Sequence, residues 1–88
     1  MTHQEIYSTL KSILAELTGR RRKNIRARHN LVSDLRFTAG GKSALNVDIN
    51  KGFAKENSPI HPPLRPSETR SATTVRDLRV LISRRFDS

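Results

Sequence analysis

The side chains that most often perform catalysis or bind metals are few in this sequence and stand apart from one another. There is no cysteine, which excludes a thiol nucleophile, a disulfide framework and a thiolate zinc site. His3, His29 and His61 lack the spacing typical of metal ligands or of a nucleophile–base pair. Asp34 and Asp77 are typical of turn and cap positions rather than of a catalytic carboxylate pair. The sequence therefore predicts a protein that is not an enzyme and holds no metal.

A glycine pair followed by lysine and serine, Gly40–Ser43, imitates the end of the phosphate-binding loop G-x-x-x-x-G-K-S/T. The first glycine of that pattern would stand at position 36, which is Arg36, and no buried strand precedes it. Because the loop directs backbone amides at phosphates between a strand and a helix, we do not expect a nucleotide site. Arg36 and Lys42 flank the glycine pair, so this segment could still hold a single anion.

Charge is the most prominent feature of the composition. Seventeen Lys and Arg against eight Asp and Glu give a formal net charge of +9. The segment 20–28, which we call the basic loop, contains six basic residues: Arg20, Arg21, Arg22, Lys23, Arg26 and Arg28. Their mutual repulsion favours a solvated loop over a regular helix. The basic loop either only keeps the protein in solution or docks an anionic partner, which would be nucleic acid, anionic lipid or an acidic protein.

Nucleic-acid binding usually combines such charge with interleaved aromatic side chains or with a helix that enters a groove. The aromatic residues Tyr7, Phe37, Phe53 and Phe86 stand instead at positions that a core would use. Any binding of nucleic acid by the basic loop would then depend on phosphate contacts, fall steeply with salt and ignore base sequence.

Hydrophobic spacing predicts three helices. The first has one apolar stripe and ends before Gly19; its apolar residues are Ile6, Leu10, Ile13, Leu14 and Leu17. The second starts at or soon after the break Phe37–Gly41, with Leu45, Ile49 and Phe53 at four-residue spacing. The last opens with a capping pattern from Thr74 to Asp77 and buries Val75, Leu78, Leu81, Ile82 and Phe86.

The remaining segments predict loops and turns. Residues 55–69 contain all four prolines and must form an irregular connection, pinned by Ile60 and Leu64, with room for one helical turn near Pro66. A short turn over 31–35 should pack Leu31, Val32 and Leu35 against the core. We therefore expect a single all-α domain over 1–88, with its core in residues 4–86 and a long basic connection over 19–30.

The longest unbroken apolar runs have three or four residues, too few to cross a membrane. The first five residues have neither the basic nor the apolar region of a secretory signal. The expectation is a cytoplasmic protein without a membrane span.

The order of these elements resembles the acyl and peptidyl carrier protein family over roughly residues 4–86, and three stretches carry the likeness. Residues 6–17 are similar to the family's first helix. Leu31-Val32-Ser33-Asp34-Leu35 is similar to the family's "LVEDL" turn, and Ala72–Leu78 is similar to the "ITTVGDL" entry of its last helix. The resemblance implies a small carrier-protein-like bundle. It also implies a place, at the start of the second helix, where the family's Asp-Ser-Leu serine receives 4′-phosphopantetheine.

This chain departs from the family at that place. The family's serine lies five residues after the aspartate of the turn and fourteen before a phenylalanine that closes the helix. Counting from Asp34 gives Ala39, and counting on from Ala39 gives Phe53, so Thr38-Ala39-Gly40 replaces Asp-Ser-Leu without a gap. Alanine has no hydroxyl to form the phosphodiester, so we expect no phosphopantetheine cofactor and no thioester chemistry.

The family's second helix also presents carboxylates to basic enzymes, and the aligned positions here hold Ala44, Asn50 and Lys51. Like charges would repel such enzymes. We therefore expect a protein-interaction module without the arm, whose basic loop and second helix bind an acidic partner, such as a genuine carrier or an enzyme of its fatty-acid, polyketide or peptide pathway. Two alternatives stay open: a working carrier modified at Ser43, and a domain that binds nucleic acid or another polyanion.

Overall fold

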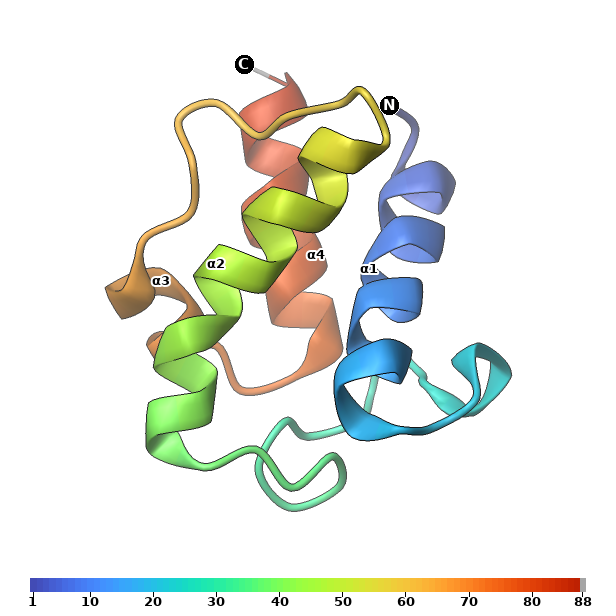
Figure 1. Ribbon diagram of the computed structural model, residues 1–88, viewed down its shortest axis with the longest axis vertical. Coiled ribbons are helices and arrows are strands. Elements are labelled where there is room, and N and C mark those ends of the chain that lie inside the picture. Colours follow the sequence, from blue (N-terminus) through green and yellow to red (C-terminus); the bar gives the residue numbers. More distant parts are fainter. Residues whose placement is uncertain (88) are drawn as a thin grey trace.

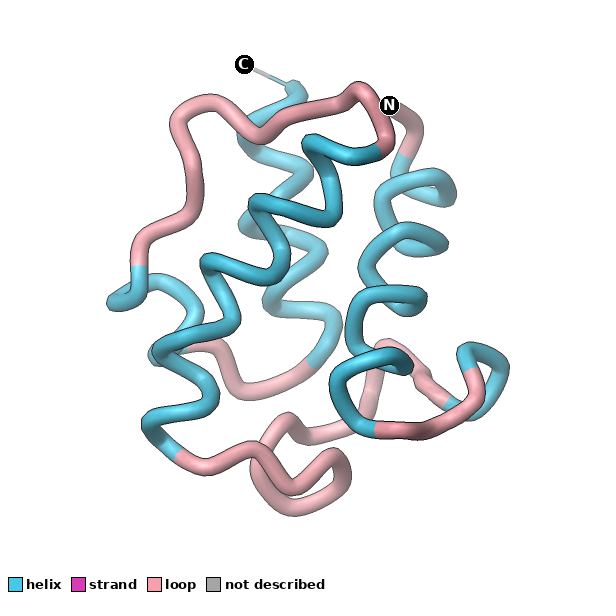
Figure 2. Tube along the Cα trace, in the orientation of Figure 1, coloured by secondary structure: helices cyan, strands magenta, loops and turns pink. Residues whose placement is uncertain are grey.

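The computed structural model describes residues 1–87 and confirms a small all-α bundle (Figure 1). Three long helices form it, α1 (His3–Thr18), α2 (Ala39–Lys55) and α4 (Val75–Asp87). A short helix, α3 (Pro66–Ser71), occupies part of the proline-rich connection, where one helical turn was expected. Figure 2 shows that loops join these helices, and within residues 1–87 there is no strand, only an isolated antiparallel bridge between Asn30 and Thr74.

The ends of α1 are fixed by local chemistry. Thr2 and Glu5 form a capping box: the Thr2 hydroxyl accepts from the Glu5 amide at 3.1 Å, and the Glu5 carboxylate accepts from the Thr2 amide at 2.9 Å. Gly19 ends the helix with a φ of 70°, a left-handed conformation that costs glycine little. Both boundaries follow from the residue types, and the stop at Thr18-Gly19 was predicted.

The core lies between α1, α2 and α4, and the loops add apolar anchors to it. Its fully buried members include Ile6, Leu10, Leu14, Ile25, Leu31, Leu45, Ile49, Phe53, Val75, Leu78 and Ile82. The ring centroids of Phe53 and Phe86 lie 6.1 Å apart, and this contact joins the end of α2 to α4. Two residues expected in the core are exposed instead: Leu17 is 43% exposed and Val32 is 51% exposed. Leu17 lies in the last turn of α1, and Val32 is the exposed member of the turn that buries Leu31 and Leu35.

The start of α4 has the predicted cap. The Asp77 carboxylate accepts from the backbone amides of Thr73 and Thr74 at 2.9 and 3.0 Å, and the Thr74 hydroxyl accepts from the Asp77 amide at 3.3 Å. The two backbone amides favour the charged form and so lower the pKa of Asp77.

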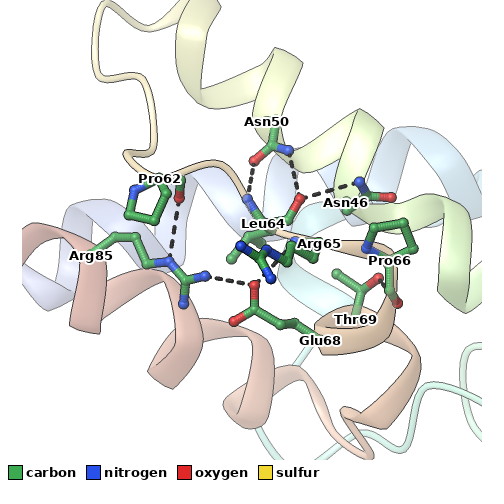
Figure 3. Close-up of polar contacts among 9 residues, drawn as sticks. All are labelled: Asn46, Asn50, Pro62, Leu64, Arg65, Pro66, Glu68, Thr69 and Arg85. Carbon is green, nitrogen blue, oxygen red and sulfur yellow. Dashed lines mark hydrogen bonds and ion pairs between the residues drawn. The ribbon is translucent and has the colours of Figure 1, made fainter.

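The proline-rich connection is held to the bundle by polar contacts on both sides (Figure 3). From α2, the Asn50 side chain accepts from the Leu64 amide at 3.0 Å and donates to the Leu64 carbonyl at 3.2 Å, and Asn46 donates to the same carbonyl at 3.2 Å. From α4, Arg85 pairs with Glu68 at 2.6 Å, and this hydrogen bond lowers the pKa of Glu68. The predicted apolar anchors Ile60 and Leu64 are both buried. The connection is therefore irregular but well ordered.

Candidate functional site

Ala39, which the resemblance aligns with a modified serine, is the first residue of α2. Thr38 caps the helix, because its hydroxyl accepts from the Gly41 amide at 2.9 Å. Ala39 and Gly40 are exposed at this corner. The first turn of α2 carries no acidic residue. The corner thus exposes the methyl group of Ala39 and the backbone of Gly40 to solvent. Its one hydroxyl, that of Thr38, is hydrogen-bonded to the backbone.

The turn before α2 fixes where that helix begins. The side-chain oxygen of Asn30 accepts from the backbone amides of Val32 and Ser33 at 2.9 and 3.0 Å. The Asp34 carboxylate accepts from the backbone amide of Asn30 at 2.7 Å. Arg36 then adopts a φ of 63°, and its side chain is exposed. Asp34 therefore has a turn role, as its position predicted.

The entry to α4 holds the same turn from the other side. The Leu31 amide donates to the Thr73 carbonyl at 2.9 Å, and the Val75 amide donates to the His29 carbonyl at 3.1 Å. The two segments that carry the family-like motifs, 31–35 and 72–78, thus contact each other directly. They position the start of α2 as one unit.

Ser43, the alternative modification site, lies in the second turn of α2 and not at its start. Its hydroxyl donates to the Ala39 carbonyl at 3.1 Å, the ordinary contact of a serine inside a helix. The side chain is half-buried. In contrast to Ala39, this residue does not stand at an exposed helix corner.

The six cations of the basic loop are all exposed. Among the side chains that the structure describes, those of residues 1–86, no carboxylate forms an ion pair with any of the six. Two are tied to neutral groups: Arg20 donates to the Asp34 carbonyl at 2.8 Å, and Arg22 donates to the Ser8 hydroxyl at 3.1 Å. The buried Ile25 anchors the loop, as predicted. The only helical structure in it is η1 (Arg22–Asn24), a single 3-10 turn.

The fold brings together some of the predicted basic residues and separates others. The basic loop, the turn with Arg36 and the start of α2 with Lys42 lie at the same end of the bundle, opposite the chain termini (Figure 1). Lys51 stands twelve residues after Ala39, about 18 Å further along α2 at 1.5 Å per residue. Of the other two aligned positions, Ala44 is exposed, whereas Asn50 uses its amide to hold Leu64.

The sequence reasoning missed a second basic cluster, on the outward face of α1. A pocket of about 510 Å³ lies there, lined by His3, Gln4, Tyr7, Ser8, Lys11, Arg22, Lys23 and Arg79. Only Arg22 and Lys23 were among the predicted binding residues. A signal was present, because His3, Tyr7 and Lys11 recur at four-residue spacing and so share one helix face. The contribution of Arg79 from α4 required the tertiary structure.

No protein-family model, curated protein or solved structure matches this chain. Among residues 1–87, no cluster of His, Asp or Glu has the arrangement that a metal ion needs. None of the described helices combines the length and the apolar character that crossing a bilayer would require.

Proposed function

We propose that this chain is a carrier-protein-like module without a phosphopantetheine arm, and that it acts by binding an acidic protein partner. The observation that carries the proposal is Ala39 at the first position of α2. In the family that the chain resembles, this corner carries the serine that bears the arm. A methyl group cannot form a phosphodiester. The proposed module therefore has the carrier-like scaffold but no thioester chemistry.

The charge of the corner supports an acidic partner. The exposed cations of the basic loop lie at the same end of the bundle as the start of α2, and no carboxylate of residues 1–86 neutralises them. Such a surface accelerates encounter with an anionic surface and repels a basic one. A genuine carrier protein, whose second helix is acidic, fits this surface better than the basic enzymes that bind the family's usual members.

The proposal is tested by titrating the chain with an acidic acyl carrier protein at low and moderate salt. In the loop variant, Arg21, Arg26 and Arg28 are replaced by Gln; these exposed side chains make no hydrogen bond in the described structure. Three surface ion pairs at about 0.5 kcal/mol each predict about tenfold weaker binding.

The matched control removes the same charge elsewhere. Its replaced residues, also exposed, are Lys55, Arg70 and Arg84, changed to Gln. The control should bind within about twofold of the unmodified chain. Equal weakening in both variants, or no binding at low salt, would contradict the proposal. Tighter, salt-dependent binding to an oligonucleotide than to the carrier would favour the polyanion alternative.

A further inference from the structure

The pocket on the outward face of α1 combines residues from three elements. α1 contributes His3, Tyr7, Ser8 and Lys11, the 3-10 turn η1 contributes Arg22 and Lys23, and α4 contributes Arg79. Four of these side chains, those of Lys11, Arg22, Lys23 and Arg79, carry a full positive charge. None of the described residues that line the pocket is a carboxylate. The fold thus gathers like charges from distant parts of the chain without neutralising them, and an anion would relieve their repulsion.

A serine hydroxyl contacts each of the two guanidinium groups. Arg22 donates to the Ser8 hydroxyl at 3.1 Å. Arg79 donates to the Ser83 hydroxyl at 3.3 Å and has a ring nitrogen of His3 at 3.4 Å. Each contact uses one nitrogen of a group that has five N–H donors, so most donors stay available. An arginine that is oriented but not neutralised is well suited to bind phosphate oxygens.

Tyr7 gives the pocket an apolar wall and carries a buried hydroxyl without a hydrogen-bond partner among the described residues. The Lys11 ammonium lies 4.7 Å from the centre of the Tyr7 ring. Burial raises the pKa of the Tyr7 hydroxyl, with Arg79 and Arg76 acting in the opposite direction, so at neutral pH it is protonated and able to donate.

We propose that this pocket binds a small phosphate monoester, with the phosphate held by Arg22, Lys23 and Arg79. A doubly charged group matches the four cations that line the pocket better than a carboxylate does. The volume of about 510 Å³ lies within the range of small-molecule sites and leaves room for an organic part against the Tyr7 ring. The pocket shares Arg22 and Lys23 with the basic loop of the proposed function, but the inference does not depend on that function because it requires no protein partner.

The test is a titration of the full chain with inorganic phosphate and with glycerol 3-phosphate at constant ionic strength. Tyr7 is the only tyrosine and there is no tryptophan, so intrinsic fluorescence reports on the pocket directly. We expect a saturable signal and a melting temperature that rises with ligand concentration. Arg22→Gln and Arg79→Gln should each weaken binding at least about tenfold.

Arg21→Gln is the matched control, because it removes the same charge from the adjacent residue, which does not line the pocket. It should change the affinity by less than about twofold. Equal weakening by Arg21→Gln and Arg22→Gln would overturn the proposal, since it would indicate a diffuse ion atmosphere. Tyr7→Phe keeps the ring and removes a hydroxyl without a partner, so the ligand-free protein should remain folded; because this variant lacks the tyrosine signal, its ligand binding is followed by the melting temperature.

A second arm uses vesicles that contain phosphatidic acid, which presents the same phosphate monoester at a lipid surface. A small-molecule site binds free glycerol 3-phosphate whether or not vesicles are present. Binding to vesicles without saturable binding of the free monoester would overturn the proposal. Binding of an oligonucleotide alone would overturn it in the same way.

Discussion

Replacing Asn50 by Ala should weaken the attachment of the proline-rich connection to α2. Asn50 is half-buried and makes two hydrogen bonds to the backbone of Leu64, a residue that is only 2% exposed. The Leu64 carbonyl keeps its second donor, Asn46, but the Leu64 amide has no other acceptor among the described residues. The substitution therefore leaves one buried N–H without a partner.

The magnitude follows from that single orphaned group. An unsatisfied buried donor costs about 1–3 kcal/mol. Alanine is the better helix former by about 0.6 kcal/mol, which offsets part of this loss. We expect the free energy of unfolding to fall by about 1–2 kcal/mol. For a domain of this size, that is a fall of about 5–15 °C in melting temperature.

Asn46→Ala provides the matched control. Asn46 is the other asparagine on the same face of α2, but its loss leaves the Leu64 carbonyl with one donor and orphans no group. With the same gain in helix propensity included, Asn46→Ala should change the free energy of unfolding by less than about 0.5 kcal/mol. Urea unfolding followed by circular dichroism measures both variants. A loss for Asn46→Ala that equals or exceeds the loss for Asn50→Ala would refute the reasoning.

Two other contacts make separate predictions. Gly52→Ala should lower the free energy of unfolding by about 1 kcal/mol, because the new Cβ would overlap the Ile13 side chain, 2.6 Å from its Cγ1, and displace that side chain from α2, which outweighs the helix propensity gained. In an Ile13→Ala background the same change should become stabilising, and an unchanged sign in a double-mutant cycle would count against the close approach. Thr74→Ala should cost about 1 kcal/mol at pH 7 through loss of the α4 cap, as measured by thermal unfolding. Since folding lowers the pKa of Asp77 from 3.8, its stabilisation is complete above that value and is lost as the pH falls through the lower, folded-state pKa. Asp77→Asn should therefore flatten the fall in stability below about pH 4, and an equally steep fall in that variant would show that other groups cause it.

Local chemistry predicted the parts of the fold that depend on neighbouring residues. The αL stop at Gly19, the Thr74–Asp77 cap and the stripe of α2 at Leu45, Ile49 and Phe53 all follow from spacing and residue type. The start of α2 was predicted at or soon after the break Phe37–Gly41, and the helix begins within that segment, at Ala39. The Thr38 cap starts the helix there.

The features that sequence reasoning missed depend on long-range contacts. Asn46 and Asn50 are weak helix formers, and their hydrogen bonds to Leu64 join parts of the chain that are distant in sequence. Val32 was predicted to pack against the core but is exposed, because hydropathy does not show which way a side chain in a turn points. The basic cluster around Tyr7 needed Arg79 to approach from α4, 72 residues away in sequence.

Intact mass spectrometry after incubation with coenzyme A and a phosphopantetheinyl transferase tests the central claim most directly. A genuine acyl carrier protein in the same reaction serves as the positive control. The methyl group of Ala39 at the start of α2 predicts that the mass of this chain stays unchanged while the control is fully modified. A gain of one phosphopantetheine arm that disappears in Ser43→Ala would contradict the claim and make this chain a working carrier.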